Sequence, residues 1–446
     1  MPVVPLPAPR WKLQSVPMDA RSGSTLSEKI VARACGRAQV RPGEVVTCRV
    51  DLALMHDSSG PRRVKSHLER LGARVWDPDR VVIASDHFVP AADAESAEFL
   101  ALTRRWARDQ GVERFYDMQG ICHVVVQEHG HVRPGMFAVG ADSHSPSGGA
   151  LGAFMFGIGS TEMAGVLVTG EIWLRVPETW RVDWRGRLRP GVSAKDMMLL
   201  LCAELGMSNE YRVFEYGGEA VDALPQMERF VLCNMATELG ADTGIVAPDA
   251  TTLAALREAG ATADEDLLQW RSDPDAGYAR RLEYDATSLD PQVAAPHSPV
   301  NSRAVGRFGD VRIDQAYIGA CTGAKLDDLR MAAEILRGRT VAAGRRLLIA
   351  PASTRTLRIA SEDGTLATLA AAGAILLPSG CGACAGFGGG VLAAGEVCIA
   401  STARNFKGRM GSSDAEVYLG SPYTVAAAAV AGRIVDPREF LGRAAA

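Results

Sequence analysis

The segment "VVIASDHFVPAADAESAEFLALTRRWARDQG", residues 81–111, contains the pattern that decides the fold. A short apolar run rich in β-branched residues predicts a strand, and the second half has the spacing of a helix. Asp86 and His87 stand between them. The same alternation recurs further on. A helix pattern or a helix start follows each of the apolar runs "MFAV", "AYIGA", "RLLIA" and "VYLG". Strands that alternate with helices predict right-handed βαβ units and therefore an α/β fold with parallel sheets.

The length of 446 residues allows about three domains. A proline-rich stretch over 284–302 predicts a linker. The first residues are rich in Pro and Ser and lack the apolar core of a secretory signal, with Met18 as an alternative start. We therefore expect a disordered extension over 1–25 and three α/β subdomains over 26–176, 177–298 and 299–446.

Composition narrows the class of partner. The chain has 48 basic and 52 acidic residues without a run of one sign, which favours a small-molecule partner over nucleic acid. No apolar stretch reaches the roughly 20 residues of a membrane span. Nine cysteines in a large chain without a signal predict the reducing cytoplasm, where close cysteine pairs bind metals or catalyse more often than they form disulfides.

Chemically reactive side chains follow several of the predicted strands. Ligands of open α/β sheets bind beyond the carboxyl ends of the strands, so we expect these side chains to converge on one crevice. They are Asp86 and His87, the group Asp142, Ser143 and His144, then Cys321, Cys381, Cys384 and Arg404.

The stretch "PSGCGACAG", residues 378–386, holds two cysteines in a CxxC spacing. Structural zinc commonly takes two such pairs, and there is no second pair here. A thioredoxin-like redox pair is typical of a shorter chain with its CxxC near the start of the domain. A cubane iron–sulfur cluster held by Cys321, Cys381 and Cys384, with one open iron as a Lewis acid, fits better.

Histidines and arginines supply further candidates. His87 and His144 lie beside or near aspartates, and an aspartate orients an imidazole for proton transfer near neutral pH; His123 is the third candidate. Arg404 and Arg409 lie about one turn apart on a polar loop, and their guanidinium groups suit a di- or tricarboxylate. Each residue alone would more often be an ordinary surface or core residue, but the set favours a site.

Seven motifs together carry a resemblance to a known family. They are "SDHFVP", "GICH", "ADSHSPSGGALG", "CNMATELGA", "GACTG", "SGCGACAG" and "RNFKGRMG", in this order. From about residue 26 to its end the sequence resembles the aconitase superfamily, and most closely the large subunit of the two-chain 3-isopropylmalate dehydratase and homoaconitase type.

The resemblance implies a three-layer α/β/α fold with three similar parallel-sheet subdomains around a central [4Fe-4S] cluster that has one iron without a cysteine ligand. It implies a hydro-lyase that isomerises a 2-hydroxy di- or tricarboxylic acid, with a separate small swivel-domain subunit. The implied residues are the cluster ligands Cys321, Cys381 and Cys384, with Asn234 beside them; the catalytic Asp86, His87, His123, Asp142, Ser143, His144 and Glu238; and the substrate-binding His56, Arg404 and Arg409.

The chain departs from the family pattern at four positions. Ala320 and Gly323 flank Cys321 where the family usually has Ser and Asn, Ala403 replaces Asn, and Gly148 replaces the His of most isopropylmalate enzymes. These departures keep other functions open. Homoaconitase, a hydratase of 2-alkylmalate or citraconate, an enzyme acting on a phosphorus-containing analogue, and a non-catalytic iron or redox sensor are the alternatives.

Overall fold

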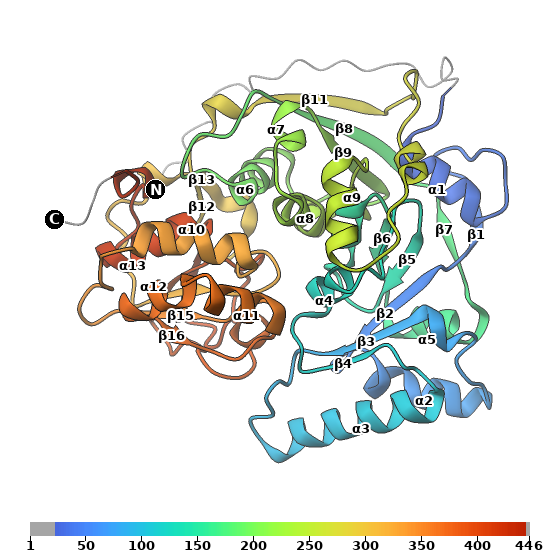
Figure 1. Cartoon of the computed structure of the whole chain (residues 1–446), viewed down its shortest axis with the longest axis horizontal. Coiled ribbons are helices and arrows are strands. Elements are labelled where there is room, and N and C mark those ends of the chain that lie inside the picture. Colours follow the sequence, from blue (N-terminus) through green and yellow to red (C-terminus); the bar gives the residue numbers. More distant parts are fainter. Residues whose placement is uncertain (1–22, 443–446) are drawn as a thin grey trace.

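The computed structural model describes residues 23–442 (Figure 1). Most of the expected disordered extension over 1–25 lies outside the described residues. The last three residues of this expected extension, 23–25, contact the folded chain. The Ser24 N–H donates to Asp273 at 2.8 Å, and Thr25 caps α1 (Leu26–Ala34) by accepting the N–H of Glu28.

The first sheet has five parallel strands in the order β4-β3-β2-β5-β6. Alternate residues of β2 face opposite sides: Ala53 and Met55 join a core with α2, α3 and α5, whereas Leu52 and Leu54 join a core with α4 and the later helix α9 (Ala250–Glu258). The elements are β2 (Leu52–His56), α2 (Pro61–Leu71), β3 (Val81–Ser85), α3 (Ala94–Gln110), β4 (Phe115–Asp117), α4 (Cys122–Glu128), β5 (Phe137–Gly140), β6 (Phe154–Gly157) and α5 (Ser160–Thr169). Beside this sheet, β1 (Val45–Arg49) and β7 (Glu171–Arg175) form an antiparallel pair.

The second sheet has four parallel strands in the order β10-β9-β8-β11. One face packs on a core that includes Trp184, Phe214 and Phe230. Its elements are β8 (Glu178–Arg185), α6 (Ala194–Leu205), β9 (Arg212–Gly217), α7 (Glu219–Asp222), α8 (Gln226–Asn234), β10 (Thr243–Val246) and β11 (Arg280–Asp285).

The third sheet has seven strands in the order β13-β12-β18-β17-β14-β15-β16, and it is parallel except at β12. Leu329, Leu369 and Val425 pack from its helices into one core, while Tyr317, Leu348 and Ala383 belong to a second core. Its elements are β12 (Gln292–Ala294), β13 (Ser302–Ala304), β14 (Gln315–Ile318), α10 (Leu326–Leu336), β15 (Arg346–Ile349), α11 (Thr354–Glu362), α12 (Thr365–Ala371), β16 (Ile375–Leu376), β17 (Val397–Ala400), β18 (Glu416–Leu419) and α13 (Pro422–Ala431).

The stretch 284–302 is not the linker that its prolines predict. Its central strand β12 pairs with β13 and β18, and Val293 is fully buried. The prolines flank this strand, where they remove no hydrogen bond of the ladder. The third sheet therefore begins at Gln292, seven residues before the expected start of the third subdomain at 299.

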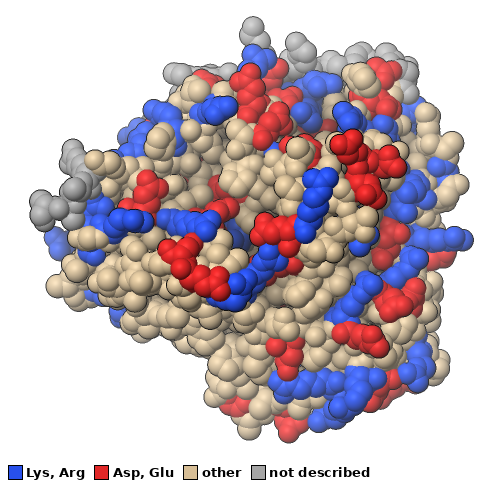
Figure 2. Space-filling model, viewed as in Figure 1, with Lys and Arg blue, Asp and Glu red and all other residues tan. Residues whose placement is uncertain are grey.

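The expected α/β class with several parallel sheets is confirmed, and Figure 1 shows the third sheet and its helices to one side of the other two. Figure 2 shows basic and acidic side chains interspersed over this face. Among residues 23–442, no helix combines the length and apolar character that crossing a bilayer requires.

Candidate functional site

Several of the candidate site residues lie at or just beyond the carboxyl ends of parallel strands. His56 is the last residue of β2, Asp86 follows β3, and Asp142 lies two residues after β5. In the third sheet, Cys321 follows β14 and Arg404 follows β17. Side-chain contacts connect the residues of the first sheet with those of the third, since Asp86 lies near Cys381 and Ser143 accepts a hydrogen bond from Arg404.

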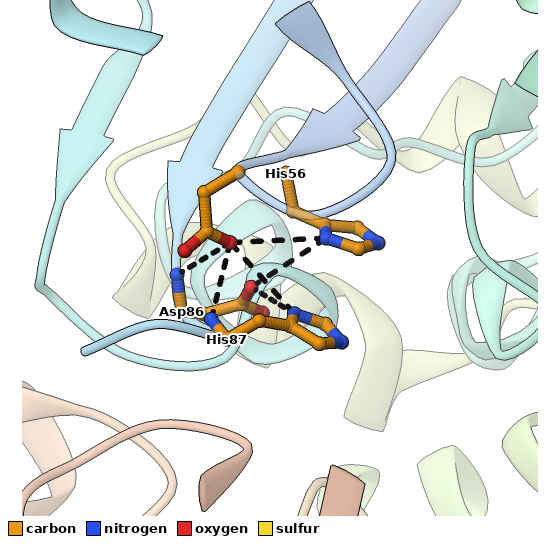
Figure 3. A group of neighbouring side chains, drawn as sticks. His56, Asp86 and His87 are labelled. Carbon is orange, nitrogen blue, oxygen red and sulfur yellow. Dashed lines mark hydrogen bonds and ion pairs between the residues drawn. The ribbon is translucent and has the colours of Figure 1, made fainter. Parts of the chain in front are cut away.

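His56, Asp86 and His87 form one compact group (Figure 3). Nδ1 of His87 donates to Oδ1 of Asp86 at 2.6 Å, and Oδ2 of Asp86 accepts the backbone N–H of Cys122 at 2.7 Å. The ring of His56 stacks on that of His87, with centroids 4.1 Å apart. Burial alone would raise the pKa of Asp86, but His87 and His56 hold it well below its usual value. Asp86 is therefore a carboxylate that fixes the orientation of His87.

Asp57 belongs to the same group, although it is not among the residues predicted from the sequence. Its fully buried carboxylate accepts the backbone N–H groups of Asp86, His87 and Phe88 at 3.3, 3.1 and 2.9 Å. These bonds tie the loop after β2 to the loop after β3. Its position directly after His56 at a strand end was a signal that could have identified it.

His56 is surrounded by carboxylates. Its ring nitrogens lie 3.8 Å from Asp57, 3.9 Å from Asp86 and 3.7 Å from Asp142. Burial lowers the pKa of His56, but these carboxylates outweigh burial and raise the pKa to about 10. The backbone N–H of Ser58, 3.3 Å from Nδ1, opposes the charge, but one amide dipole is weaker than three carboxylates. The carboxylates thus favour the protonated form of His56.

Asp142 joins His56 to two further histidines. Its Oδ1 accepts Nε2 of His123 at 2.7 Å and the backbone N–H of His144 at 2.8 Å. Burial favours the neutral acid, yet the bonds from His123 and His56 hold the pKa of Asp142 well below its usual value. Asp86, Asp57 and Asp142 have the donor atoms of metal ligands, but each already accepts two or more hydrogen bonds or histidine contacts. Asp86 and Asp142 thus have the geometry of groups that orient imidazoles, and Asp57 that of a group that holds backbone N–H groups.

Glu238, in the 3₁₀ helix Met235–Leu239, connects His144 with Arg404. Oε1 of this fully buried carboxylate accepts Nε2 of His144 at 3.0 Å and Nε of Arg404 at 2.7 Å. Burial raises the pKa of Glu238, but His144 and Arg404 overcome burial and lower the pKa to about 2. Nη1 of Arg404 also donates to Oγ of Ser143 at 2.9 Å.

The three predicted cluster cysteines are free thiols; Cys321 and Cys384 are buried, and Cys381 is half-buried. Asn234 donates Nδ2 to Sγ of Cys321 at 3.3 Å, and Sγ of Cys381 lies 3.9 Å from Oδ2 of Asp86. Burial raises the pKa of Cys321 to about 12, and the nearby Cys384 adds to the rise. Burial also raises the pKa of Cys381 well above its usual value, as do Asp86 and Cys384.

The residues present fit an iron–sulfur cluster. Metal ligation requires thiolates, and burial with mutual repulsion makes thiolates here unfavourable unless a highly charged cation binds them. Four buried polar atoms of the predicted site residues have no hydrogen-bond partner among residues 23–442. They are Oδ1 of Asn234, Oε2 of Glu238, Nδ1 of His123 and Nε of Arg409. Arg409 is the one predicted site residue that the contacts above do not join to the others.

Two departures from the family pattern have a steric basis. A Cβ on Gly323 would lie 2.1 Å from Oγ and 2.6 Å from the carbonyl oxygen of Ser401, so Ser401 occupies the space of a side chain at 323. A Cβ on Gly148 would lie 2.6 Å from Sδ of Met155. Ala320 has a left-handed φ of 69°, and nothing in the structure explains Ala403.

The site is distinct from a cavity of about 530 Å³ among α4, α8, α9, α10 and α11. None of the candidate residues lines that cavity, whose walls include Met227, Leu256 and Ile359. The site is therefore defined by its side-chain chemistry and not by this cavity.

Comparison with known proteins identifies the family of this chain. The profile of the aconitase family (aconitate hydratase) matches residues 28–432. The chain belongs to the aconitase family. This membership confirms the expected class of enzyme, a hydro-lyase, and members of the family carry a [4Fe-4S] cluster.

Among its relatives in the aconitase family, the 3-isopropylmalate dehydratase large subunit 1 of Methanopyrus kandleri is 46% identical over 94% of this chain and 100% of its own. The 3-isopropylmalate dehydratase large subunit of Desulfatibacillum aliphaticivorans is 43% identical over 94% and 100% of the two chains. The probable methanogen homoaconitase large subunit of Methanothermobacter thermautotrophicus is 42% identical over 94% and 98%.

Proposed function

We propose that this chain is the cluster-bearing large subunit of a 3-isopropylmalate dehydratase-like enzyme, which isomerises a 2-hydroxy dicarboxylic acid by dehydration and rehydration. The observation that carries the proposal is the proximity of three free thiols, two of them buried and one half-buried, to three histidines held by carboxylates. The relatives named above support the substrate class.

In this proposal Cys321, Cys381 and Cys384 hold a [4Fe-4S] cluster, and Asn234 supports the sulfur of Cys321. When bound, the cluster would supply a Lewis acid for the hydroxyl group of the substrate through the iron that has no cysteine ligand. The chain itself contributes the orientation of the thiols, and Asp86 lies between the sulfur of Cys381 and the imidazole of His87.

The histidines handle protons in fixed orientations. Asp86 accepts a hydrogen bond from Nδ1 of His87. Figure 3 shows that the other ring nitrogen of His87 points away from the carboxylates drawn, so that nitrogen is free to give or take a proton. Asp142 accepts a hydrogen bond from Nε2 of His123. Nδ1 of His123 has no hydrogen-bond partner among the described residues. Elimination of water needs a group that protonates the leaving hydroxyl, and an imidazole held by a carboxylate suits that task at neutral pH.

Arg404 binds a carboxylate of the substrate in this proposal. Glu238 and Ser143 use Nε and one hydrogen of Nη1, so part of the guanidinium fork remains for a second carboxylate. The positive charge of His56 lies at the end of β2 on the same side, and Nε of Arg409 lacks a partner among residues 23–442. These cations suit an acidic substrate.

A separate small subunit would complete the site. The relatives are named large subunits, and apolar side chains are exposed beside the motifs: Phe387 is 38%, Val391 45% and Phe406 36% exposed. We call these three residues the apolar rim. Its two loops run side by side, because the N–H of Leu392 donates to the carbonyl of Met410 at 2.8 Å. Apolar side chains next to a polar site indicate a protein partner.

The cellular compartment and the subdomain boundaries also belong to the proposal. We place the enzyme in the cytoplasm, because all nine cysteines are free. We also propose three subdomains close to 26–176, 177–298 and 299–446, with the second boundary moved to about residue 290 so that β12 stays with its sheet.

Homoaconitase is the second candidate function, because a relative of that name is 42% identical.

Anaerobic reconstitution with iron and sulfide tests the proposal. We expect about four irons per chain and the broad visible absorption of a [4Fe-4S] cluster. Cys381→Ser should abolish both, whereas Cys35→Ser, at a half-buried cysteine outside the site, should leave both unchanged. One tightly bound zinc without sulfide would refute the cluster. Turnover of 3-isopropylmalate and of homoaconitase substrates with the small subunit added then separates the two functions.

A further inference from the structure

Lys195 is a buried cation that the proposed reaction does not use. It is the second residue of α6, in the otherwise mostly apolar sequence "AKDMMLLLCAEL", and only 1% of its surface is exposed. A lysine is rarely buried to this extent without a paired charge. Its surroundings must therefore supply what water would otherwise provide.

The ammonium group of Lys195 joins two loops that carry proposed functional residues. Nζ donates to the carbonyl oxygen of Thr402 at 2.5 Å and of Ser401 at 3.3 Å, and it lies 3.5 Å from Oγ1 of Thr322. Thr322 directly follows Cys321, and Thr402 lies two residues before Arg404. One buried side chain from α6 thus fixes the position of a cluster loop relative to the arginine loop.

None of these three acceptors is a carboxylate. Lys325, which is also fully buried, differs from Lys195 in this respect, because its Nζ lies 2.5 Å from Oδ2 of Asp328. The Lys325 charge is therefore neutralised within the chain. Carbonyl dipoles alone compensate a buried ammonium incompletely.

Groups of the proposed site act on the charge of Lys195, together with Cys202 of its own helix. Burial lowers its pKa to about 8, and Glu238 and Cys321 act in the opposite direction, followed by Cys202 and Cys384. Glu238 is already paired with His144 and Arg404. Metal ligation holds cysteines as thiolates, so a cluster bound by Cys321 and Cys384 would place negative charge near Lys195.

We propose that Lys195 is a positioning residue that serves as the internal counter-charge of the thiolate-bound cluster and holds the Cys321 loop against the Arg404 loop. This inference rests on the cluster site proposed above. A cation at this place stabilises added negative charge, so it favours the reduced form of a bound cluster.

The reduction potential of the reconstituted cluster tests this role. Lys195→Met keeps the length of the side chain and removes its charge, so the potential should shift to a more negative value. Thr322→Val is the matched control: it removes one oxygen near Nζ but no charge, and the potential should stay that of the parent chain. Equal potentials in the parent and Lys195→Met would overturn the proposal.

A second measurement compares melting temperatures with and without the cluster. If the bound thiolates are the counter-charge of Lys195, loading the cluster should raise the melting temperature less in Lys195→Met than in the parent chain. An equal rise in both would contradict the proposal. If Lys195→Met does not fold, Lys195→Arg keeps the charge and should keep the parental potential, and a shift in that variant would also contradict it.

A parent chain that assembles no cluster overturns both the role of Lys195 and the proposed function. A parent chain with a normal cluster, together with a Lys195→Met variant of unchanged potential, overturns only the role of Lys195.

Discussion

Arg404 and the buried Glu238 form an ion pair, in which Nε of the arginine donates to Oε1 of the glutamate at 2.7 Å. The two residues are 166 positions apart in the sequence. The same oxygen also accepts from His144, so one carboxylate orients a cation for substrate and an imidazole for proton transfer. Arg404 therefore has a structural partner as well as its proposed ligand.

Replacing Arg404 by lysine should impair catalysis more than folding. Lysine keeps the charge but cannot form the two bonds to Glu238 and Ser143 while it binds a carboxylate. A charge-assisted bond is worth about 1.5–3 kcal/mol, so kcat/KM should fall about ten- to a hundredfold. Steady-state kinetics with the small subunit measures this. Lys407→Ala, at an exposed neighbour, is the control; an unchanged kcat/KM in Arg404→Lys would refute the carboxylate role.

Asp57→Asn should destabilise the fold around the site. The amide keeps one acceptor oxygen but turns an NH₂ group toward backbone N–H groups that now donate to the carboxylate. We expect a loss of about 3 kcal/mol in the free energy of unfolding, measured by urea denaturation. Asp310→Asn, at an exposed position, should change stability by less than about 0.5 kcal/mol. Equal effects of the two substitutions would show that the three amide bonds contribute little.

The charge of His56 should make stability depend on alkaline pH. Its pKa is about 10 in the folded chain and about 6.5 when unfolded, so its contribution is fully present below pH 6.5. The contribution is lost as the pH rises through about 10. His56→Gln should therefore be less stable than the parent at pH 7, and the two should converge toward pH 10. A constant difference between urea midpoints from pH 6 to 10 would contradict a charged His56.

Gly323→Ala should destabilise the loop that carries Cys321. Its Cβ would overlap Oγ of Ser401 at 2.1 Å and the carbonyl oxygen of the same residue at 2.6 Å. Overpacking of this kind costs about 1–3 kcal/mol, and bound iron should fall with it. Ser401→Ala should not rescue the variant, because the carbonyl remains. Gly165→Ala is the control: it has open space within α5 and should slightly raise the melting temperature.

Phe387→Asp should prevent assembly with the small subunit. The ring is 38% exposed, so a charge there should disturb the apolar rim more than the fold. We expect the parent chain to co-purify with the small subunit and the variant to remain alone, with its cluster intact. Leu71→Asp, at another exposed apolar residue at the end of α2, is the control. Assembly of Phe387→Asp at the parental affinity would place the interface elsewhere.

The sequence predicted the strand and helix alternation well, because local periodicity reports which faces are buried. The expected strand "VVIAS" is β3, and the expected helix after it is α3. The linker expected over 284–302 failed for a definite reason. Its prolines predict an interruption of regular structure. The pairing of β12 with β18 in this stretch depends on residues more than a hundred positions away, which local sequence does not show.

The sequence by itself determined which residue types stand at the ends of strands, because the residues just beyond a strand's carboxyl end are simply the next ones along the chain. It therefore supplied the cysteines, the aspartates and the histidines. Only the tertiary structure decided their partners. His123 pairs with Asp142, His144 pairs with Glu238 94 residues away, and His56 lies among three carboxylates. Such pairings depend on sheet order and helix packing, as does the burial of Lys195, and no local spacing encodes those distances.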